Sequence, residues 1–157
     1  MSTKNSQNTK TVETLNVLLA TVSDFYFTYK YFHWNITGQD FHEFHLLFDA
    51  HALVIFPSID LIAERIRQMD GAAYGDFRTY SENTKIEPNR PFTKDNIQAI
   101  LQYLVKQHDT IIDILETIID HTDQNSDVST ADLLTQFLKE YQQMRWFIKA
   151  SINKQQD

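Results

Sequence analysis

The stretch that decides the fold is VETLNVLLATVSDFYFTYKYFHWNITG, residues 12–38. Its apolar residues recur at spacings of three and four, which is the repeat of one face of an α-helix. The repeat stops at Asn35-Ile-Thr-Gly38, where a turn is expected. We therefore predict a long helix that starts at Val12. Its buried face is predicted to hold Leu15, Leu18, Leu19, Val22, Phe25, Tyr29 and Phe32.

A second helix is predicted from Asp40 to about Met69. Asp40 and Glu43 have the spacing of a capping box, in which two side chains bond the free N–H groups of the first turn. Pro57 lies inside this helix, one turn before Asp60. Because proline removes a backbone donor, we expect a kink there that re-aims the side chains beyond it.

Two more helices are expected in the C-terminal half. Thr93 is the predicted N-cap of the third, and Ser129 or Thr130 that of the fourth, with Asp132 in its first turn. The polar segment 121–129 separates them. The apolar positions are Ile97, Ile100, Leu101, Leu104, Ile111, Leu115, Ile118 and Ile119 in the third helix, and Leu134, Phe137, Leu138, Tyr141, Phe147, Ile148 and Ile152 in the fourth.

The connections predict the topology. The first and second helices are joined tightly, as are the third and fourth, while residues 71–91 form a long link between the pairs. A link of that length is expected to carry structure, and 77–82 has the pattern of a short helix. An all-α, ferritin-like four-helix bundle with one long crossover fits this order. We expect one bundle domain over residues 12–154, after a flexible polar tail at 1–11.

Composition narrows the function classes. The 157 residues include three Gly, three Pro and no Cys, which argues against all-β folds, phosphate-binding glycine loops, disulfides and thiolate metal sites. Lys plus Arg is 14 and Asp plus Glu is 21, so the net charge is −7. A chain this acidic should attract cations and repel nucleic acid. No secretory signal or run of 18 apolar residues is found, so a cytoplasmic protein that spans no membrane is expected.

Potential metal ligands gather between His33 and Glu64. His45 and Asp49 are four residues apart and share a helix face, and so do Asp60 and Glu64. Imidazole and carboxylate together suit iron, zinc and manganese. Such pairs are also common on solvated helix faces, so each pair alone is weak support for a metal site.

Helix geometry separates the two pairs. His45 and Asp60 are 15 residues apart on one helix, which is roughly 22 Å at 1.5 Å per residue. They cannot bind one ion within a subunit. His33, just before the turn, can fold back beside His45. A two-fold axis between antiparallel copies of the second helix would join both half-sites twice, so we expect an intersubunit site. No Glu-x-x-His motif occurs in the chain, which disfavours a di-iron site inside one bundle.

These residues carry a family resemblance. The run His33-Trp34-Asn35-Ile36-Thr37-Gly38 is followed by Asp40-Phe41, His45, Asp49 and then Asp60-x-x-Ala63-Glu64-Arg65-Ile66. The spacing of 12, 15 and 4 residues between His33, His45, Asp60 and Glu64 resembles the ferroxidase signature of the Dps family, or miniferritins. The resemblance covers about Val12 to Ile152 and ends at Trp146-Phe147-Ile148.

The resemblance implies a ferroxidase. Twelve subunits would form a hollow shell, iron(II) would be oxidised at the two-fold interface, preferentially by hydrogen peroxide, and ferric mineral would be stored inside, without an organic cofactor. The implied iron ligands, which are also the catalytic residues, are His33, His45 and Asp49 of one subunit with Asp60 and Glu64 of its mate. Trp34 matches the aromatic residue beside the site, with radical quenching and packing as its alternative roles.

Three further expectations remain open. Asp127 and Asp132 match the region that lines the family's iron-entry pores. Helix capping is the alternative role for Asp132, and a place in a solvated loop is the favoured alternative for Asp127. His51 is expected on the surface, with an auxiliary metal site as the alternative. DNA binding is expected to be weak or absent, because the N-terminal tail has only Lys4 and Lys10. The competing functions are a DNA-condensing protein, associated with the bacterial nucleoid, and a structural shell with little ferroxidase activity.

Overall fold

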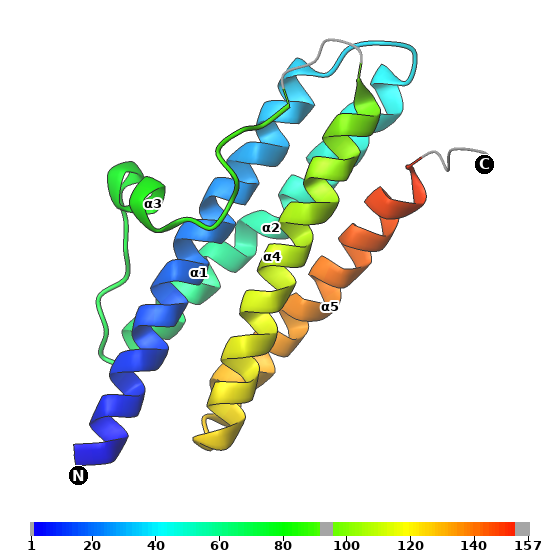
Figure 1. Cartoon of the computed structure of the whole chain (residues 1–157). Coiled ribbons are helices and arrows are strands. Elements are labelled where there is room, and N and C mark those ends of the chain that lie inside the picture. The colour runs from blue at the N-terminus through cyan, green and yellow to red at the C-terminus, as the bar shows by residue number, and fades with distance from the viewer. Residues whose placement is uncertain (1, 92–95, 153–157) are drawn as a thin grey trace.

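A computed structural model describes residues 2–91 and 96–152. The described residues form five helices and no strand: α1 Ser2–Asn35, α2 Phe41–Gln68, α3 Phe77–Asn83, α4 Ile97–Gln124 and α5 Val128–Ala150. α1 pairs with α2, and α4 pairs with α5, while α3 lies beside α1 in the crossover between the pairs (Figure 1). The predicted all-α four-helix bundle with a short helix in its long crossover is confirmed.

The core matches the predicted helix faces closely. All seven residues predicted for the first helix are buried, and the eight of the third are buried or packed against the core. Phe147 is the exception in α5, because 43% of its surface is exposed. Burial of each large apolar side chain contributes roughly 1.5–3 kcal/mol, so this aromatic interior is the main source of stability.

α1 begins earlier than the apolar repeat predicted. The helix starts at Ser2, ten residues before the predicted start at Val12, so it includes residues 2–11. Thr11 is buried, and Val12 packs against the core. A Cβ atom added to Gly71, after α2, would lie 2.5 Å from Val12 Cγ1. This close approach of α1 to the end of α2 supports the added turns in a segment that lacks an apolar repeat.

The helix caps differ from three predictions. Asp40 is the N-cap residue of α2, but its φ of −97° and ψ of 23° are not extended, and its side chain makes no cap hydrogen bond. Asn96 caps α4 by accepting from Ala99 N, while Thr93 lies outside the described residues. Asp127 caps α5, not Ser129 or Thr130, because its carboxylate accepts from Thr130 N. Asp132 therefore lies beyond the first turn of α5.

α2 is continuous from Phe41 through Pro57 to Gln68. Proline leaves the carbonyl four residues earlier without its helical donor, yet the helix continues on both sides. Asp60 and Glu64 thus belong to the same helix as His45. By length and composition alone, α2 is apolar enough to cross a membrane. In the bundle, its apolar residues divide between the core and an exposed face.

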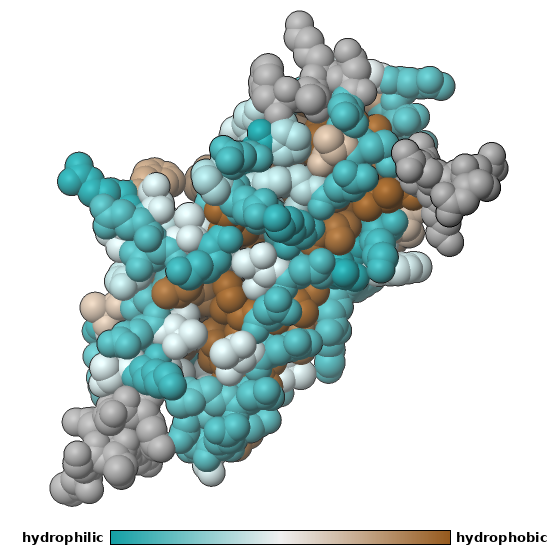
Figure 2. Space-filling view, in the orientation of Figure 1, coloured by the Kyte–Doolittle hydropathy of each residue, from teal (hydrophilic) through white to brown (hydrophobic). Residues whose placement is uncertain are grey.

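The opposite side of the molecule is more polar. The face formed by α1, α3 and α4 is largely hydrophilic, with apolar side chains visible along the seam between the helices (Figure 2). On α2, by contrast, exposed large hydrophobic side chains occur along most of the helix: Phe41, Leu46, Leu53, Val54, Phe56 and Leu61. The two sides of the bundle therefore face different surroundings or partners.

Candidate metal centre

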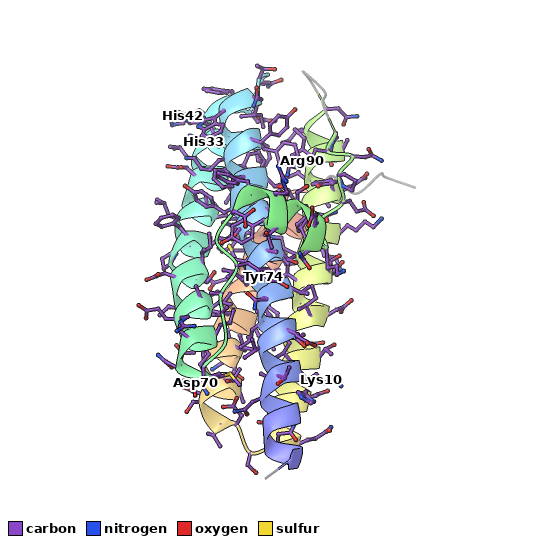
Figure 3. The ribbon with its side chains drawn as sticks, turned by 90° about the vertical axis from the view of Figure 1, so that its left-hand side faces the viewer. Lys10, His33, His42, Asp70, Tyr74 and Arg90 are labelled. Atoms are coloured by element: carbon purple, nitrogen blue, oxygen red, sulfur yellow. The ribbon has the colours of Figure 1, made fainter. Side chains whose placement is uncertain are left out.

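His33 and His45 meet where α1 and α2 join. His33 lies in the last turn of α1 and His45 near the start of α2, and Gly38, with a φ of +112°, reverses the chain between them. Their rings stack with centroids 3.8 Å apart and an interplanar angle of 22°. Figure 3 shows His33 at the end of the bundle that also carries His42. The prediction that His33 folds back beside His45 is confirmed.

A reciprocal pair of hydrogen bonds fixes both rings. His33 Nδ1 donates to the carbonyl oxygen of His45 at 2.7 Å, and His45 Nδ1 donates to that of His33 at 2.9 Å. A carbonyl oxygen only accepts, so both Nδ1 atoms carry hydrogen. In the neutral rings both Nε2 atoms then keep a free lone pair, the form that binds a metal ion. The backbone partners of the two imidazoles were beyond sequence reasoning.

Asp49 lies beside this pair but is engaged by a cation. Its Oδ1 is 3.9 Å from His33 Nε2 and accepts a 2.6 Å hydrogen bond from Lys30 Nζ. That bond, with the charge of Lys30 and smaller effects of the two imidazoles, lowers the pKa of Asp49. The carboxyl side chain is 39% exposed, so solvent screens the ion pair. The carboxylate is therefore ionised and reachable, and Lys30 neutralises it.

Lys30 is the neighbour that sequence reasoning missed. It lies three residues before His33 on α1, a spacing that puts both on one helix face, and this signal was available. Lys30 Nζ also lies 5.8 Å from the ring centroid of Trp34, within cation–π range. Trp34 is 64% exposed, so it does not pack in the interior of this bundle.

Asp60 and Glu64 lie on the same helix, well away from the histidine pair. Both are exposed, and neither has a hydrogen-bond or ion-pair partner within residues 2–91 and 96–152. Across those residues no three His, Asp or Glu side chains converge in a way that would hold a metal ion. His33, His45 and Asp49 thus form one half-site, and Asp60 and Glu64 remain a separate pair within the subunit.

Comparisons with known proteins identify the family. A family model described as the ferritin-like domain matches residues 12–156. A DNA protection during starvation protein from Agrobacterium fabrum is 30% identical over 140 residues, 89% of this chain and 86% of the relative. The chain belongs to the Dps family of ferritin-like proteins.

Solved Dps structures share the whole fold. Dps from Thermosynechococcus elongatus superposes with a TM-score of 0.91 at 26% identity, over 97% of this chain and 96% of that one. A Dps protein from Vibrio cholerae O1, described as a member of the ferritin-like diiron-carboxylate superfamily, gives 0.88 at 26% identity, over 95% and 92%. The Dps resemblance predicted from the signature residues is confirmed.

The two extra histidines of α2 in this Dps-family chain differ sharply. His42 is exposed. His51 was expected on the surface, but only 4% of it is exposed, and its Nδ1 lies 3.0 Å from the hydroxyl of Tyr29. The expectation was wrong because His51 follows the buried side of α2, between Phe48 and Ile55. Its desolvation lowers the pKa of His51 to about 4.

His108 on α4 contacts the same tyrosine as His51. It is fully buried, and its Nε2 lies 2.7 Å from the same Tyr29 hydroxyl. Sequence reasoning did not single it out, although its place between Leu104 and Ile111, four and three residues away, put it on the apolar face of its helix. An imidazole there needs a buried polar partner, which Tyr29 supplies.

The predicted pore residues have other contacts. Asp127 Oδ1 accepts a 2.9 Å hydrogen bond from Arg65 as well as capping α5. Asp132 is exposed, and its Oδ2 accepts from Gln136 at 3.2 Å. Asp127 therefore has a structural role in this Dps-family bundle that ties α2 to α5. Asp132 keeps an exposed carboxylate, and its role at a pore stays a prediction.

Proposed function

We propose that this protein is an iron-sequestering miniferritin with ferroxidase activity. It oxidises iron(II), preferably with hydrogen peroxide, at a site shared between two subunits, and stores the ferric product in a hollow shell of twelve subunits. Iron is the substrate and cargo, and no organic cofactor takes part. Removal of both iron(II) and peroxide protects a bacterial cytoplasm from oxidative stress.

A single stripe on α2 carries the proposal. His45, Asp49, Leu53, Phe56, Asp60 and Glu64 follow one another at spacings of four, four, three, four and four residues. At 3.6 residues per turn these positions share one side of the helix. Leu53 and Phe56, in the middle, are 67% and 58% exposed. The stripe is therefore apolar at its centre, with potential ligands at both ends.

The stripe is symmetric about its centre. His45 precedes Val54 by nine residues and Glu64 follows Ile55 by nine, while Asp49 and Asp60 are each five residues away. In two antiparallel helices related by a two-fold axis at this point, His45 of one copy faces Glu64 of the other, and Asp49 faces Asp60. Leu53 and Phe56 of each copy face one another at the axis. The same contact that buries the apolar centre thus completes two metal sites.

The residues suit iron chemistry. His33 and His45 offer two Nε2 lone pairs, and their Nδ1–H groups are held by backbone carbonyls. Three carboxylates, those of Asp49, Asp60 and Glu64, favour the higher charge of iron(III) over iron(II). Hydrogen peroxide accepts two electrons, and two iron(II) ions supply them, so peroxide is reduced to water with no radical released. The few imidazoles hold iron(II) modestly, which lets the product move to the mineral.

The acidic charge supports storage. The net charge of −7 per chain, repeated over a shell, draws cations to its openings. Asp132, exposed near the start of α5, is proposed as a pore residue, with Asp127 as the weaker candidate because Arg65 neutralises it. Trp34, beside the Lys30–Asp49 pair, is proposed to intercept radicals that escape the site.

DNA binding is the competing function. A relative is named for DNA protection during starvation, which supports DNA binding as the alternative function. The acidic chain has few cationic residues near its ends, so we propose weak or absent binding at physiological salt. A gel-shift with supercoiled plasmid near neutral pH tests it: free plasmid is expected, and strong retardation would favour the DNA-condensing function.

Anaerobic iron oxidation tests the main proposal. The purified chain is loaded with iron(II) and then mixed with hydrogen peroxide, and the near-ultraviolet absorbance of ferric oxo species is followed. A fast rise with two iron(II) consumed per peroxide is expected, and the same sample should give no hydroxyl-radical adduct with a spin trap. A protein that leaves the rate of iron oxidation at that of buffer would be a structural shell without ferroxidase activity.

A further inference from the structure

A tyrosine hydroxyl lies between two imidazoles inside the bundle. Tyr29 on α1 has its hydroxyl 2.7 Å from His108 Nε2 and 3.0 Å from His51 Nδ1. Tyr29 and His108 are fully buried, and His51 is 4% exposed. We call these three residues the buried cluster. It draws on α1, α2 and α4, and none of its members is a predicted iron ligand.

The protonation states follow from burial. Desolvation raises the pKa of Tyr29 well above its usual value and lowers that of His108 well below its own. The phenol therefore keeps its proton, and both imidazoles stay neutral. A hydroxyl has one hydrogen to donate, and we assign it to His108 Nε2 because that contact is the shorter. His51 then donates through Nδ1 to the phenol oxygen.

Stability alone does not account for this cluster. His108 Nδ1 is buried and has no hydrogen-bond partner in the described part of the chain. A polar core network with an unsatisfied member is less favourable than apolar side chains of the same shape. The position is instead suited to chemistry, since a phenol hydrogen-bonded to a neutral base can lose an electron and its proton together.

The cluster lies close to the histidine half-site. Tyr29 is four residues before His33 on α1, about 6 Å along the helix axis. Phe48 bridges the two regions, because its ring centroid lies 6.0 Å from that of Tyr29 and 6.2 Å from that of Phe32, the residue next to His33. Aromatic rings therefore lead from Tyr29 through Phe48 to Phe32, the residue before His33 in the chain.

We propose that Tyr29 is a buried one-electron donor to the iron site, with His108 as the acceptor of its proton. This inference rests on the proposed ferroxidase function. It concerns turnovers in which a site holds a single iron(II), which supplies one of the two electrons that hydrogen peroxide takes. Tyr29 supplies the missing electron before a radical leaves the protein.

The step balances. One iron(II) and hydrogen peroxide give iron(III), hydroxide and a hydroxyl radical. Tyr29 then loses one electron, which reduces that radical to hydroxide, and the phenol proton moves to His108 Nε2. The products are a Tyr29 phenoxyl radical, an imidazolium at His108 and a second hydroxide. A later iron(II) returns the electron and becomes iron(III), and His108 returns the proton to the phenol oxygen.

Freeze-quench electron paramagnetic resonance tests the proposal. The wild-type protein, with iron(II) below one ion per site, is mixed anaerobically with hydrogen peroxide. A transient organic radical is expected, and ring-deuterated tyrosine should narrow its spectrum. Tyr29→Phe should abolish this tyrosyl signal and raise the yield of spin-trapped hydroxyl radical. Tyr141→Phe is the matched control, because Tyr141 is another buried tyrosine of the core and should leave the signal unchanged.

A second variant separates chemistry from structure. His108→Gln keeps a side-chain oxygen that can accept from the phenol but removes the basic nitrogen, so it should also lose the radical. Formation of the radical in the wild-type protein should slow in heavy water. Absence of a tyrosyl signal in the wild type, or its persistence in Tyr29→Phe, would overturn the inference while ferric absorbance still rose. If no ferric product formed in any sample, the proposed function would fail and this inference with it.

Discussion

The bundle holds two histidine clusters, one between α1 and α2 and one that also includes His108 of α4, and they differ in their hydrogen-bond partners. His33 and His45, with Asp49, form an open cluster in which backbone carbonyls hold both Nδ1 atoms. In the buried cluster, His51 and His108 share the hydroxyl of Tyr29. His45 and His51 are six residues apart, so at about 100° per residue they face different sides of α2.

The position of each histidine in the bundle decides which chemistry its ring supports. In the open cluster the Nε2 atoms, which no backbone carbonyl holds within the described residues, can bind a metal ion, and the Asp49 carboxylate lies beside Nε2 of His33. In the buried cluster one nitrogen of each ring is hydrogen-bonded to the phenol, and desolvation keeps both rings neutral at rest. The open cluster therefore suits metal binding, and the buried one suits proton transfer.

The largest expected effect comes from removing the imidazoles of the open cluster. His33→Ala combined with His45→Ala should abolish peroxide-dependent iron oxidation, since both Nε2 ligands are lost. The absorbance rise of ferric species measures it. His42→Ala is the matched control, because His42 is an exposed histidine of α2, the helix that carries His45. Full activity in the double variant would remove the open cluster from the mechanism.

The next effect concerns the apolar centre of the α2 stripe. Leu53→Glu with Phe56→Glu should prevent assembly and abolish iron oxidation together, because a buried unpaired carboxylate opposes the two-fold contact. Size-exclusion chromatography with light scattering measures the assembly. Phe77→Glu, at a position 74% exposed on α3, is the control. An active, fully assembled stripe variant would contradict the two-fold register at residues 54 and 55.

The buried cluster should make stability depend on pH. The pKa of His51 is about 4 in the folded chain and about 6.5 when unfolded, so between these values the unfolded state binds the extra proton. Stability is fully present above pH 6.5 and falls as the pH drops towards 4, by up to about 3 kcal/mol. Urea unfolding between pH 7 and 4 measures it.

Substitution of His51 is the control for this dependence of stability on pH. His51→Leu should make the dependence shallower over this pH range, because the leucine does not titrate, while His108, whose pKa burial also lowers, keeps its own contribution. His42→Ala should leave it in place, since His42 is exposed. An equally steep loss of stability in His51→Leu would assign the pH dependence to other groups.

The smallest effect concerns Lys30. Lys30→Met should change stability by about 1 kcal/mol or less, as expected for a partly exposed ion pair. It should raise the pKa of Asp49 towards its ordinary value and strengthen binding of zinc(II), a redox-inert probe, because the cation no longer competes for the carboxylate. Isothermal titration calorimetry measures the affinity. Weaker zinc binding in the variant would mean that Lys30 positions Asp49 for the metal.

Sequence periodicity predicted most of the fold. The buried faces of α1 and α4 follow from three- and four-residue spacings, which depend only on the helical repeat. The caps were harder, because Asp40 and Asp127 are both Asp residues near helix starts and only the backbone dihedrals decide which side chain bonds. The start of α1 was missed because its first ten residues lack an apolar repeat.

Sequence likewise predicted only part of the candidate site. The approach of His33 to His45 follows from the turn between α1 and α2, and the separation of Asp60 follows from helix length. The bond from Lys30 to Asp49 and the burial of His51 depend on how α1, α2 and α4 pack, and no local spacing determines that. Sequence therefore located the half-site, and packing determined its charge and its neighbours.

Subunit complementation tests the intersubunit site most directly. One chain carries His33→Ala and His45→Ala, and a second, differently tagged chain carries Asp60→Asn and Glu64→Gln. Each alone should be inactive. In a mixed dimer one of the two sites receives both intact halves. When the two chains assemble at random, about half of the dimers are mixed, so the co-assembled protein should recover about a quarter of the wild-type rate of iron oxidation with hydrogen peroxide. Mixtures as inactive as the separate variants would contradict a site shared across the two-fold axis.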